Sequence, residues 1–186
     1  MTELYIVRHG ETEWSKSGRH TSFTDLDLTD HGIEEAKRLR SLLDPSEFDL
    51  VLSSPRLRAR RTAELAGFTD VEIDEDLMEW NYGDYEGRTS VQIRKQVPGW
   101  RIWTHHIPGG EQHGEVMERL GRVAERIRYS EVDKAICFAH GHSLRVLALS
   151  WLNIDISRGA SFPLKTGSVS ILGYEKESPA ILRWNS

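Results

Sequence analysis

The chain has 186 residues, of which 38% are hydrophobic, enough for one domain with a substantial core. Its 24 basic and 29 acidic residues give a formal net charge of −5, which argues against nucleic acid or an anionic membrane surface as the main partner. Cys137 is the only cysteine, so an intramolecular disulfide is excluded and a reducing, cytoplasmic location is expected. No apolar run is long enough to predict a membrane span.

The first predicted element is a buried strand over residues 3–8, an apolar run that ends directly in Arg8, His9 and Gly10. The carboxyl end of such a strand is where an open α/β sheet builds its site. A glycine at this position lacks the side chain that would block the close approach of a ligand. The sequence therefore predicts that His9 lies at a binding cleft.

A helix is expected next, from Thr29 as its N-cap residue until Pro45 stops it. Residues 49–53 predict a second strand. A second helix is expected over residues 55–66, with Gly67 as the C′ residue that ends it.

Four arginines fall within six residues at the start of this second helix: Arg56, Arg58, Arg60 and Arg61. A helix N-terminus favours anions, and arginines there would form a phosphate cradle. Helical spacing places Arg58 and Arg61 on one face and Arg60 on another. The alternative is a solvated basic face, but the presence of Arg8 and of two His-Gly turns favours a phosphate site.

The remaining predicted elements are a short strand at 71–74, a helix at 111–128, a strand at 134–139, a helix at 142–152 and strands at 168–175 and 180–184. The strand at 134–139 ends in His140 and Gly141, so two imidazoles are expected to meet at one cleft. Strands that alternate with helices favour an α/β sheet covered on both faces, within a single domain of residues 1–186. Residues 76–110, rich in aromatics and glycine, fit a cap or binding loop.

Four motifs in chain order resemble the histidine phosphatase superfamily, the phosphoglycerate-mutase-like fold class. They are Arg8-His9-Gly10-Glu11-Thr12, then Ser53-Ser54-Pro55 with Arg58, then Glu79 with Gly83 and Glu86-Gly87, and finally Ala139-His140-Gly141-His142-Ser143. The resemblance covers nearly the whole chain. It implies a three-layer α/β/α sandwich with a mostly parallel central sheet, and a small loop and helix cap over the site.

The resemblance implies that His9 is the nucleophile that takes the phosphoryl group. Arg8, Arg58 and His140 would bind the oxygens of this group, and Glu79 would protonate the leaving oxygen and then activate water. A phosphohistidine divides a very slow hydrolysis into two easier steps. Neighbouring arginines lower the pKa of a histidine, and its second ring nitrogen needs a fixed acceptor, expected to be a backbone carbonyl.

Further substrate contacts are expected from five residues: Ser15, Arg19, Thr21, Gly141 and His142. Ser15 and Thr21 stand where family members place small polar phosphate contacts, although the family often carries asparagine at the first position. His142 has the rival role of capping the helix that follows it. The acid also has rivals: Glu75, Asp84 and Glu86 lie near the assigned Glu79 in the sequence, and Glu11 closely follows the expected nucleophile.

Other phosphatase chemistries fit poorly. A cysteine-dependent phosphatase needs an arginine six residues after its nucleophile, but Ser143 is six residues after Cys137, which is assigned to the core. Residues 25–29 match an aspartate-nucleophile pattern but follow polar residues rather than a strand. His140 and His142 with scattered carboxylates give no zinc or two-metal spacing, so no metal and no cofactor are expected.

The favoured function is a phosphatase that acts through a phosphohistidine on a small phosphorylated metabolite. The alternatives are a phosphoglycerate mutase and a non-catalytic phosphate-binding module. By resemblance, mutases carry an arginine pair after an Arg-Ile-Trp stretch, where this chain has Thr104 and His105. The resemblance is to short bacterial acid phosphatases, which implies broad specificity at mildly acidic pH.

The mouth of the site offers few further cations beyond Arg19, Arg88 and Arg101, which favours a monophosphate with a neutral or modestly charged remainder. At least half of the aromatic side chains of the cap are expected to pack against each other rather than bind substrate. Tryptophans expected at the surface would permit a homodimer. Neither nucleic acid nor a membrane is expected as a partner.

Overall fold

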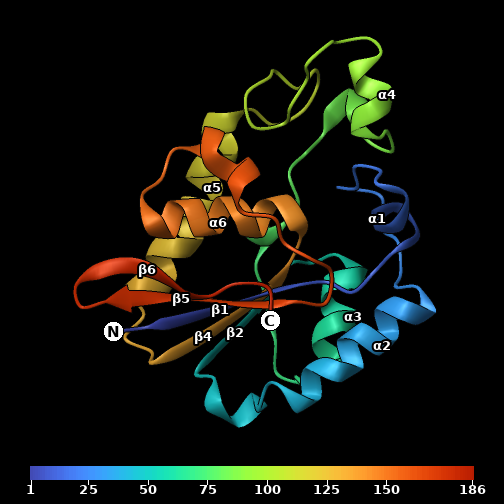
Figure 1. Ribbon diagram of the computed structural model, residues 1–186. Helices are drawn as coiled ribbons and strands as arrows, with labels where there is room; N and C mark the ends of the chain where they lie inside the picture. Colours follow the sequence, from blue (N-terminus) through green and yellow to red (C-terminus); the bar gives the residue numbers. More distant parts are fainter.

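The computed structural model describes residues 1–186 and is centred on a six-stranded sheet with the order β3-β2-β4-β1-β5-β6 (Figure 1). The strands are β1 (Glu3–Arg8), β2 (Leu50–Ser53), β3 (Glu72–Ile73), β4 (Lys134–Ala139), β5 (Val169–Glu175) and β6 (Ser178–Arg183). β1 to β4 pair with one another in parallel, whereas β5 pairs antiparallel with both β1 and β6. The predicted α/β class with a mostly parallel sheet is confirmed.

Helices cover both faces of this sheet: α2 (Asp30–Arg38) and α3 (Leu57–Leu65) on one face, α5 (His113–Arg128) and α6 (Gly141–Leu152) on the other (Figure 1). Each pair of helices has its own apolar cluster beneath it. In α5, Val116, Leu120, Val123 and Ile127 recur at helical spacing and are buried, which is why this helix packs on the sheet. No helix combines the length and the apolar character needed to cross a bilayer.

The register of the sheet brings two strand ends together. Arg8 at the end of β1 pairs with Ala139 at the end of β4, which lies between β1 and β2. Because β1 and β4 are parallel, the next residues, His9 and His140, leave the sheet at the same edge. The predicted meeting of two imidazoles therefore follows from strand pairing alone.

Several short helices are missing from the sequence-based prediction, and two of them show why. α1 (Glu13–Ser17) follows the turn after β1, and a 3₁₀ helix spans Ile156–Ser161. Neither is long enough to show a hydrophobic period. Both are set by capping: Thr12 and Ser15 form a capping box for α1, and the carboxylate of Asp155 accepts a backbone hydrogen bond at the start of the 3₁₀ helix.

Several element boundaries also differ slightly from the prediction. α3 begins at Leu57, because Arg56 is its extended N-cap residue. Gly67 after α3 has a φ of +98°, which confirms the predicted C′ position. β3 is reduced to two residues, and α2 gives way to a 3₁₀ turn at Leu39.

Residues 76–110 form the upper part of the molecule in Figure 1 and include α4 (Ser90–Arg94). The aromatic side chains of this cap are buried: Trp80, Tyr82, Tyr85, Trp100 and Trp103. All five join the larger apolar cluster, so packing accounts for more of them than predicted. The expectation of surface tryptophans in this region is wrong, and it no longer supports a homodimer.

The cap is tied to the segment after α1 by backbone hydrogen bonds. The N–H of His20 donates to the carbonyl of Arg88 at 2.9 Å, and the N–H of Gly87 donates to the carbonyl of His20 at 2.8 Å. The carboxylate of Glu86 accepts from the N–H of Ser22 at 2.8 Å. We call residues 19–22 and 86–89 together the rim bridge.

Candidate active site

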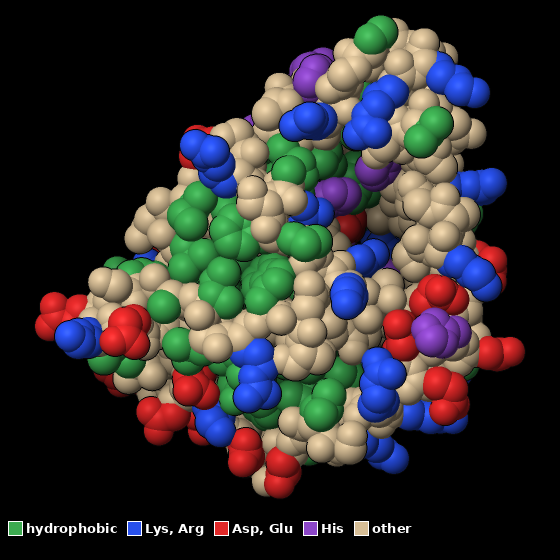
Figure 2. Space-filling view, viewed as in Figure 1, with side chains coloured by type: hydrophobic (Ala, Val, Ile, Leu, Met, Phe, Trp, Pro, Cys, Tyr) green, Lys and Arg blue, Asp and Glu red, His purple; other side chains and the backbone are tan.

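A cavity of about 170 Å³ opens at the carboxyl edge of β1 and β4. Residues after β1 and at the start of α6 form its floor, and the turn after α1 and the cap form its rim. Figure 2 shows that this face is hollowed and that histidine and basic side chains gather there. We call this cavity the main pocket.

His9 follows β1 directly, and its buried ring lines the main pocket. Its Nδ1 lies 2.7 Å from the carbonyl oxygen of Gly10, the kind of backbone acceptor that the sequence predicted. Because a carbonyl can only accept, Nδ1 carries the proton, and Nε2 is left for a ligand. Burial, followed by the charges of Arg58 and Arg8, holds the pKa of His9 well below its usual 6.5. The ring is therefore neutral and nucleophilic at neutral pH.

Gly10 lets the turn that carries His9 pack directly on α2. A Cβ on Gly10 would overlap the carbonyl oxygen of Gly32, and one on Gly32 would overlap that of Glu11. The N–H of Gly10 also donates to the hydroxyl of Thr62 on α3 at 3.1 Å. The nucleophile's turn is thus held between α2 and α3.

Arg8 presents unpaired donors to the main pocket. Its Nη1 donates to the carbonyl of Leu164 at 2.5 Å, but its Nε is buried and has no partner in the protein. The guanidinium lies against the start of α6, where a Cβ on Gly141 would be 3.2 Å from it. Buried donors are normally paired, so this arrangement suits a bound anion.

Arg58 is fully buried and does not line the main pocket. Its terminal nitrogens donate to the carbonyls of Thr21, Ser22 and Thr24 at 3.0–3.2 Å. Its Nε donates to Nδ1 of His140 at 3.2 Å. In this structure Arg58 therefore fixes the segment after α1 and the second imidazole, and its charge acts on His9 through space.

His140 is likewise fully buried outside the lining of the main pocket. Since its Nδ1 accepts from Arg58, its Nε2 carries the proton and donates to the hydroxyl of Ser54 at 2.7 Å. Its ring centroid lies 5.3 Å from that of His9. Burial, and then the charge of Arg58, hold the pKa of His140 well below the usual histidine value, so this ring is neutral too.

Only Arg58 of the four clustered arginines turns toward the site. The other three lie outside the main pocket: Arg56, Arg60 and Arg61. Arg61 pairs with Asp27 at 3.3 Å, and the carboxylate of Asp25 accepts from the N–H of Leu57 at the start of α3. The prediction that Arg58 and Arg61 share a phosphate-facing side is wrong, because acidic residues before the strand already occupy this helix end.

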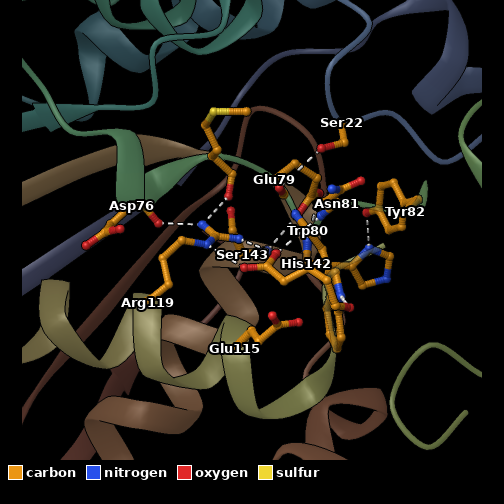
Figure 3. A network of polar contacts seen from close by, with 12 residues as sticks. Ser22, Asp76, Glu79, Trp80, Asn81, Tyr82, Glu115, Arg119, His142 and Ser143 are labelled. Atoms are coloured by element: carbon orange, nitrogen blue, oxygen red, sulfur yellow. Dashed lines mark hydrogen bonds and ion pairs between the residues drawn. The ribbon is translucent and has the colours of Figure 1, made fainter. Parts of the chain in front are cut away.

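Glu79 reaches the main pocket from the cap, and α6 holds its carboxylate. The carboxylate accepts from the N–H groups of Trp80 at 2.9 Å, Ser143 at 2.8 Å and His142 at 3.1 Å (Figure 3). Three backbone donors and the positive end of the helix dipole fix its position. Glu79 therefore caps the helix that begins just after His140.

None of the rival carboxylates lines the main pocket: Glu11, Glu75, Asp84 and Glu86. Glu11 accepts from the hydroxyl of Thr29 at 2.9 Å, and Glu86 belongs to the rim bridge. Glu79 is thus the one carboxylate that the structure places beside His9 in the cavity.

His142 lines the main pocket and is bound from the cap side. Its Nδ1 lies 2.6 Å from the hydroxyl of Tyr82 (Figure 3). Burial, and then the charges of Arg145 and His20, hold the pKa of His142 well below the usual value. Because Glu79 caps α6, the alternative role of His142 as a helix cap is wrong.

Three predicted substrate contacts lie on the outer wall of the main pocket: Ser15, Arg19 and Thr21. The hydroxyl of Ser15 is engaged in the capping box with Thr12, at 2.9 and 3.0 Å. The hydroxyl of Thr21 donates to the carbonyl of Arg19 at 3.1 Å. The guanidinium of Arg19 is exposed and lies 5.9 Å from the ring centroid of Trp14.

The structure adds six lining residues that sequence reasoning did not assign to the site, and three of them have large polar side chains: His20, Tyr82 and Arg145. Arg145 donates through Nε to the carbonyl of Gly159 at 3.0 Å. Its place three residues after His142 on one helix was the signal that could have found it. Burial lowers the pKa of His20 to about 4, but no sequence pattern marks this residue.

The main pocket therefore combines the neutral imidazole of His9, one carboxylate and three arginines, Arg8, Arg19 and Arg145. No group of three or more His, Cys, Asp or Glu side chains is arranged to hold a metal ion. A phosphate ester fits these functions, because its oxygens need cationic donors and its leaving group needs a proton.

Known proteins resemble this chain in sequence and in fold. The model of the histidine phosphatase superfamily (branch 1) matches residues 4–186. An acid phosphatase of Mycobacterium tuberculosis is 40% identical over 175 residues, 92% of this chain and 86% of the relative. A sedoheptulose 1,7-bisphosphatase of Saccharomyces cerevisiae is 36% identical over 185 residues, 82% of this chain and 68% of the relative. A solved structure from M. tuberculosis superposes with a TM-score of 0.94 at 36% identity, covering 99% of this chain and 97% of the other.

Proposed function

This chain belongs to the histidine phosphatase superfamily, and we propose that it hydrolyses phosphate monoesters of small metabolites through a phosphohistidine on His9. One observation carries the proposal. The Nδ1–H of His9 is held by Gly10, so the unprotonated Nε2 is the ring atom left to a ligand in a pocket with Arg8.

In the first step, Nε2 of His9 attacks phosphorus, the bond from phosphorus to the ester oxygen breaks, and Glu79 gives its proton to that oxygen. Charge on the transferring group is met by Arg8 and Arg145 in the wall, with Arg58 behind it. This step requires Glu79 in its protonated form.

In the second step, water attacks the phosphohistidine while Glu79, now a carboxylate, takes a proton from it. The bond from phosphorus to Nε2 breaks, and inorganic phosphate leaves with His9 neutral again. The three backbone hydrogen bonds on Glu79 hold it in place through both steps. Because the pKa of His9 lies well below 6.5, the nucleophile stays unprotonated at mildly acidic pH, as an acid-type phosphatase needs.

A phosphatase is favoured over a mutase because Thr104 and His105 stand where the arginine pair was sought and neither lines the main pocket. The two curated relatives reported above are named as phosphatases. We also propose that the reaction needs no metal, since arginines supply the positive charge. The domain assignment is part of the proposal: residues 1–186 act as one catalytic domain, with 76–110 as its cap, in a reducing cytoplasm. The homodimer stays a prediction.

The test is hydrolysis of p-nitrophenyl phosphate with and without EDTA, together with acid-labile labelling of the protein by ³²P substrate. Phosphate release and labelling should survive EDTA and fall at least about 10³-fold in His9→Ala. His106→Ala, which removes an exposed histidine of the cap, is the matched control. Undiminished turnover in His9→Ala would overturn the mechanism, and net isomerisation of a phosphoglycerate without phosphate release would indicate a mutase.

A further inference from the structure

A second cavity of about 380 Å³ adjoins the main pocket, and we call it the side pocket. The two cavities share one wall, formed by His20, His142 and Arg145. Most of the remaining lining comes from the cap, including Arg94 on α4 and Arg101 after it, and Ala160 comes from the 3₁₀ helix after α6. In Figure 2, basic and histidine side chains continue upward from the hollow onto the cap.

The charge of the side pocket is one-sided. Three arginines line it, Arg94, Arg101 and Arg145, and no aspartate or glutamate does. This is unexpected in a chain whose formal net charge is −5. A cavity whose ionisable lining is entirely basic or imidazole raises the local concentration of anions.

The arginines of the side pocket are held without carboxylate partners. Nε of Arg94 donates to the carbonyl of Trp100 at 2.9 Å. Arg145 donates to the carbonyl of Gly159, and its guanidinium lies 4.5 Å from the ring centroid of Trp103. Burial lowers the pKa of Arg145 to about 10, so it remains charged at neutral pH. Neither guanidinium forms a salt bridge with a carboxylate of the protein.

The lining of the side pocket also contains a buried donor without a partner. Trp100 lines the side pocket and is 1% exposed, and its indole N–H has no hydrogen-bond partner in the protein. Buried donors without a partner are uncommon and often mark a place that a ligand or water completes. The hydroxyl of Ser90 and the ring of His20, 3.3 Å apart, add further polar atoms.

We propose that the substrate carries a second anionic group, which binds in the side pocket while its scissile phosphate lies against His9. This inference rests on the proposed phosphatase function. The substrate class is then a small phosphate ester with a phosphate or carboxylate at its other end, joined by a short chain because the pockets share a wall. It replaces the expectation of a neutral or modestly charged remainder, because the sequence did not show that Arg94, Arg101 and Arg145 line one cavity.

The test compares esters that differ only at their far end. The substrates are butyl phosphate, 1,4-butanediol bisphosphate and 4-phosphooxybutanoate, each assayed for kcat/KM with the full chain. We expect kcat/KM for at least one of the two esters with a second anionic group to exceed that for butyl phosphate tenfold. This is well beyond the twofold statistical gain of a symmetric bisphosphate. The better of the two identifies phosphate or carboxylate as the second group. Equal kcat/KM for all three would overturn the proposal.

The variants Arg94→Gln and Arg101→Gln, alone and combined, locate the second group. The ratio of kcat/KM between the preferred substrate and butyl phosphate should fall about tenfold in the double variant, mainly through KM. Lys95→Gln, an exposed cation next to Arg94 that does not line the side pocket, should keep the ratio. A ratio that persists in the double variant would overturn the assignment to this cavity.

A failure of the phosphatase function and a failure of the side-pocket inference give different results. If the unmodified protein does not hydrolyse p-nitrophenyl phosphate, the phosphatase function itself is wrong. If it hydrolyses that ester but shows no preference for a second anion, only the side-pocket inference is wrong.

Discussion

The side chains of the floor and of the rim of the main pocket are held by different contacts. In the floor, the ring of His9 is fixed by a hydrogen bond to a backbone carbonyl, and Arg58, behind the floor, is fixed by three more. In the rim, backbone hydrogen bonds join the two segments of the rim bridge, but the side chains pack on aromatic rings. The ring of His20 lies 4.7 Å from that of Tyr82, and Arg145, which reaches the rim from α6, packs over Trp103. The backbone of the floor is positioned by the sheet and tolerates little change, whereas side chains of the rim that are held by packing can be replaced by other residues. We therefore expect reaction chemistry and substrate choice to depend on separately variable parts of one cavity.

The largest effect on activity is expected at Glu79, the cap residue whose carboxylate binds backbone N–H groups of α6. Glu79→Gln should lower kcat/KM for an alkyl phosphate by about 10²–10⁴-fold, because the leaving oxygen loses its proton donor. The loss for p-nitrophenyl phosphate, whose leaving group needs little protonation, should be much smaller. Steady-state kinetics with both esters measures the difference.

Glu75→Gln is the control for that experiment, since it removes an exposed carboxylate on the same segment. Equal losses for both esters in Glu79→Gln would show that the residue acts only as a helix cap.

The second effect concerns the pH dependence of stability, and it should involve both floor and rim because both contain buried neutral histidines. The pKa values of His9, His20, His140 and His142 are lowered in the folded protein, mainly by burial. The unfolded chain therefore binds more protons below about pH 6.5, and stability is lost as the pH falls. His20, with a pKa of about 4, accounts for up to about 3 kcal/mol between pH 6.5 and 4. Urea unfolding at pH 7.5, 6 and 5 measures the slope.

His20→Gln should flatten that slope, whereas the exposed His106→Gln should leave it unchanged. An identical slope in both variants would contradict the assignment to buried histidines.

A third prediction compares two glycine substitutions. Gly10→Ala should destabilise the fold by about 1–3 kcal/mol, because the added methyl overlaps the carbonyl of Gly32, and should lower kcat by moving His9. Gly121→Ala, in the middle of α5 with open space around it, should instead stabilise by about 0.5–1 kcal/mol. Thermal unfolding and kcat together test the pair, and a neutral Gly10→Ala would contradict the tight packing of this turn.

The smallest effect is expected at the exposed edge of the rim. Arg19→Gln removes a solvated cation, so KM should rise by only about two- to threefold, and the effect should vanish at high salt. An effect of tenfold or more would mean that Arg19 leaves Trp14 and binds the phosphate directly, which would move it from the rim to the floor.

The sequence predicts the floor better than the rim. β1 and β4 appear as continuous apolar runs that end in His-Gly, and parallel pairing then dictates where His9 and His140 meet. The backbone acceptor of His9 could be predicted because a fixed tautomer requires one. These inferences need only local pattern and sheet geometry.

The rim could not be predicted because tertiary contacts decide it. Arg58 and Arg61 look equivalent on a helical wheel, but Asp27, on a loop far away in the sequence, pairs with only one of them. The aromatic residues of the cap follow no period, so their burial does not show in the sequence. His20 and Arg145 became site residues only when the cap folded over α6.

The rim bridge has a mechanical consequence. The N–H of His20 donates to the carbonyl of Arg88, and the carbonyl of His20 accepts from Gly87. The carboxylate of Glu86 also binds the N–H of Ser22. Because of these bonds, we expect the outer wall to move only together with the cap. The turn of His9, clamped between two helices, cannot follow such a movement. We therefore expect product release to require a hinge motion of the outer wall together with the cap, while His9 stays in place. The amides of His20 and Gly87 should accordingly exchange hydrogen at one common rate, slower than the opening of any exposed loop.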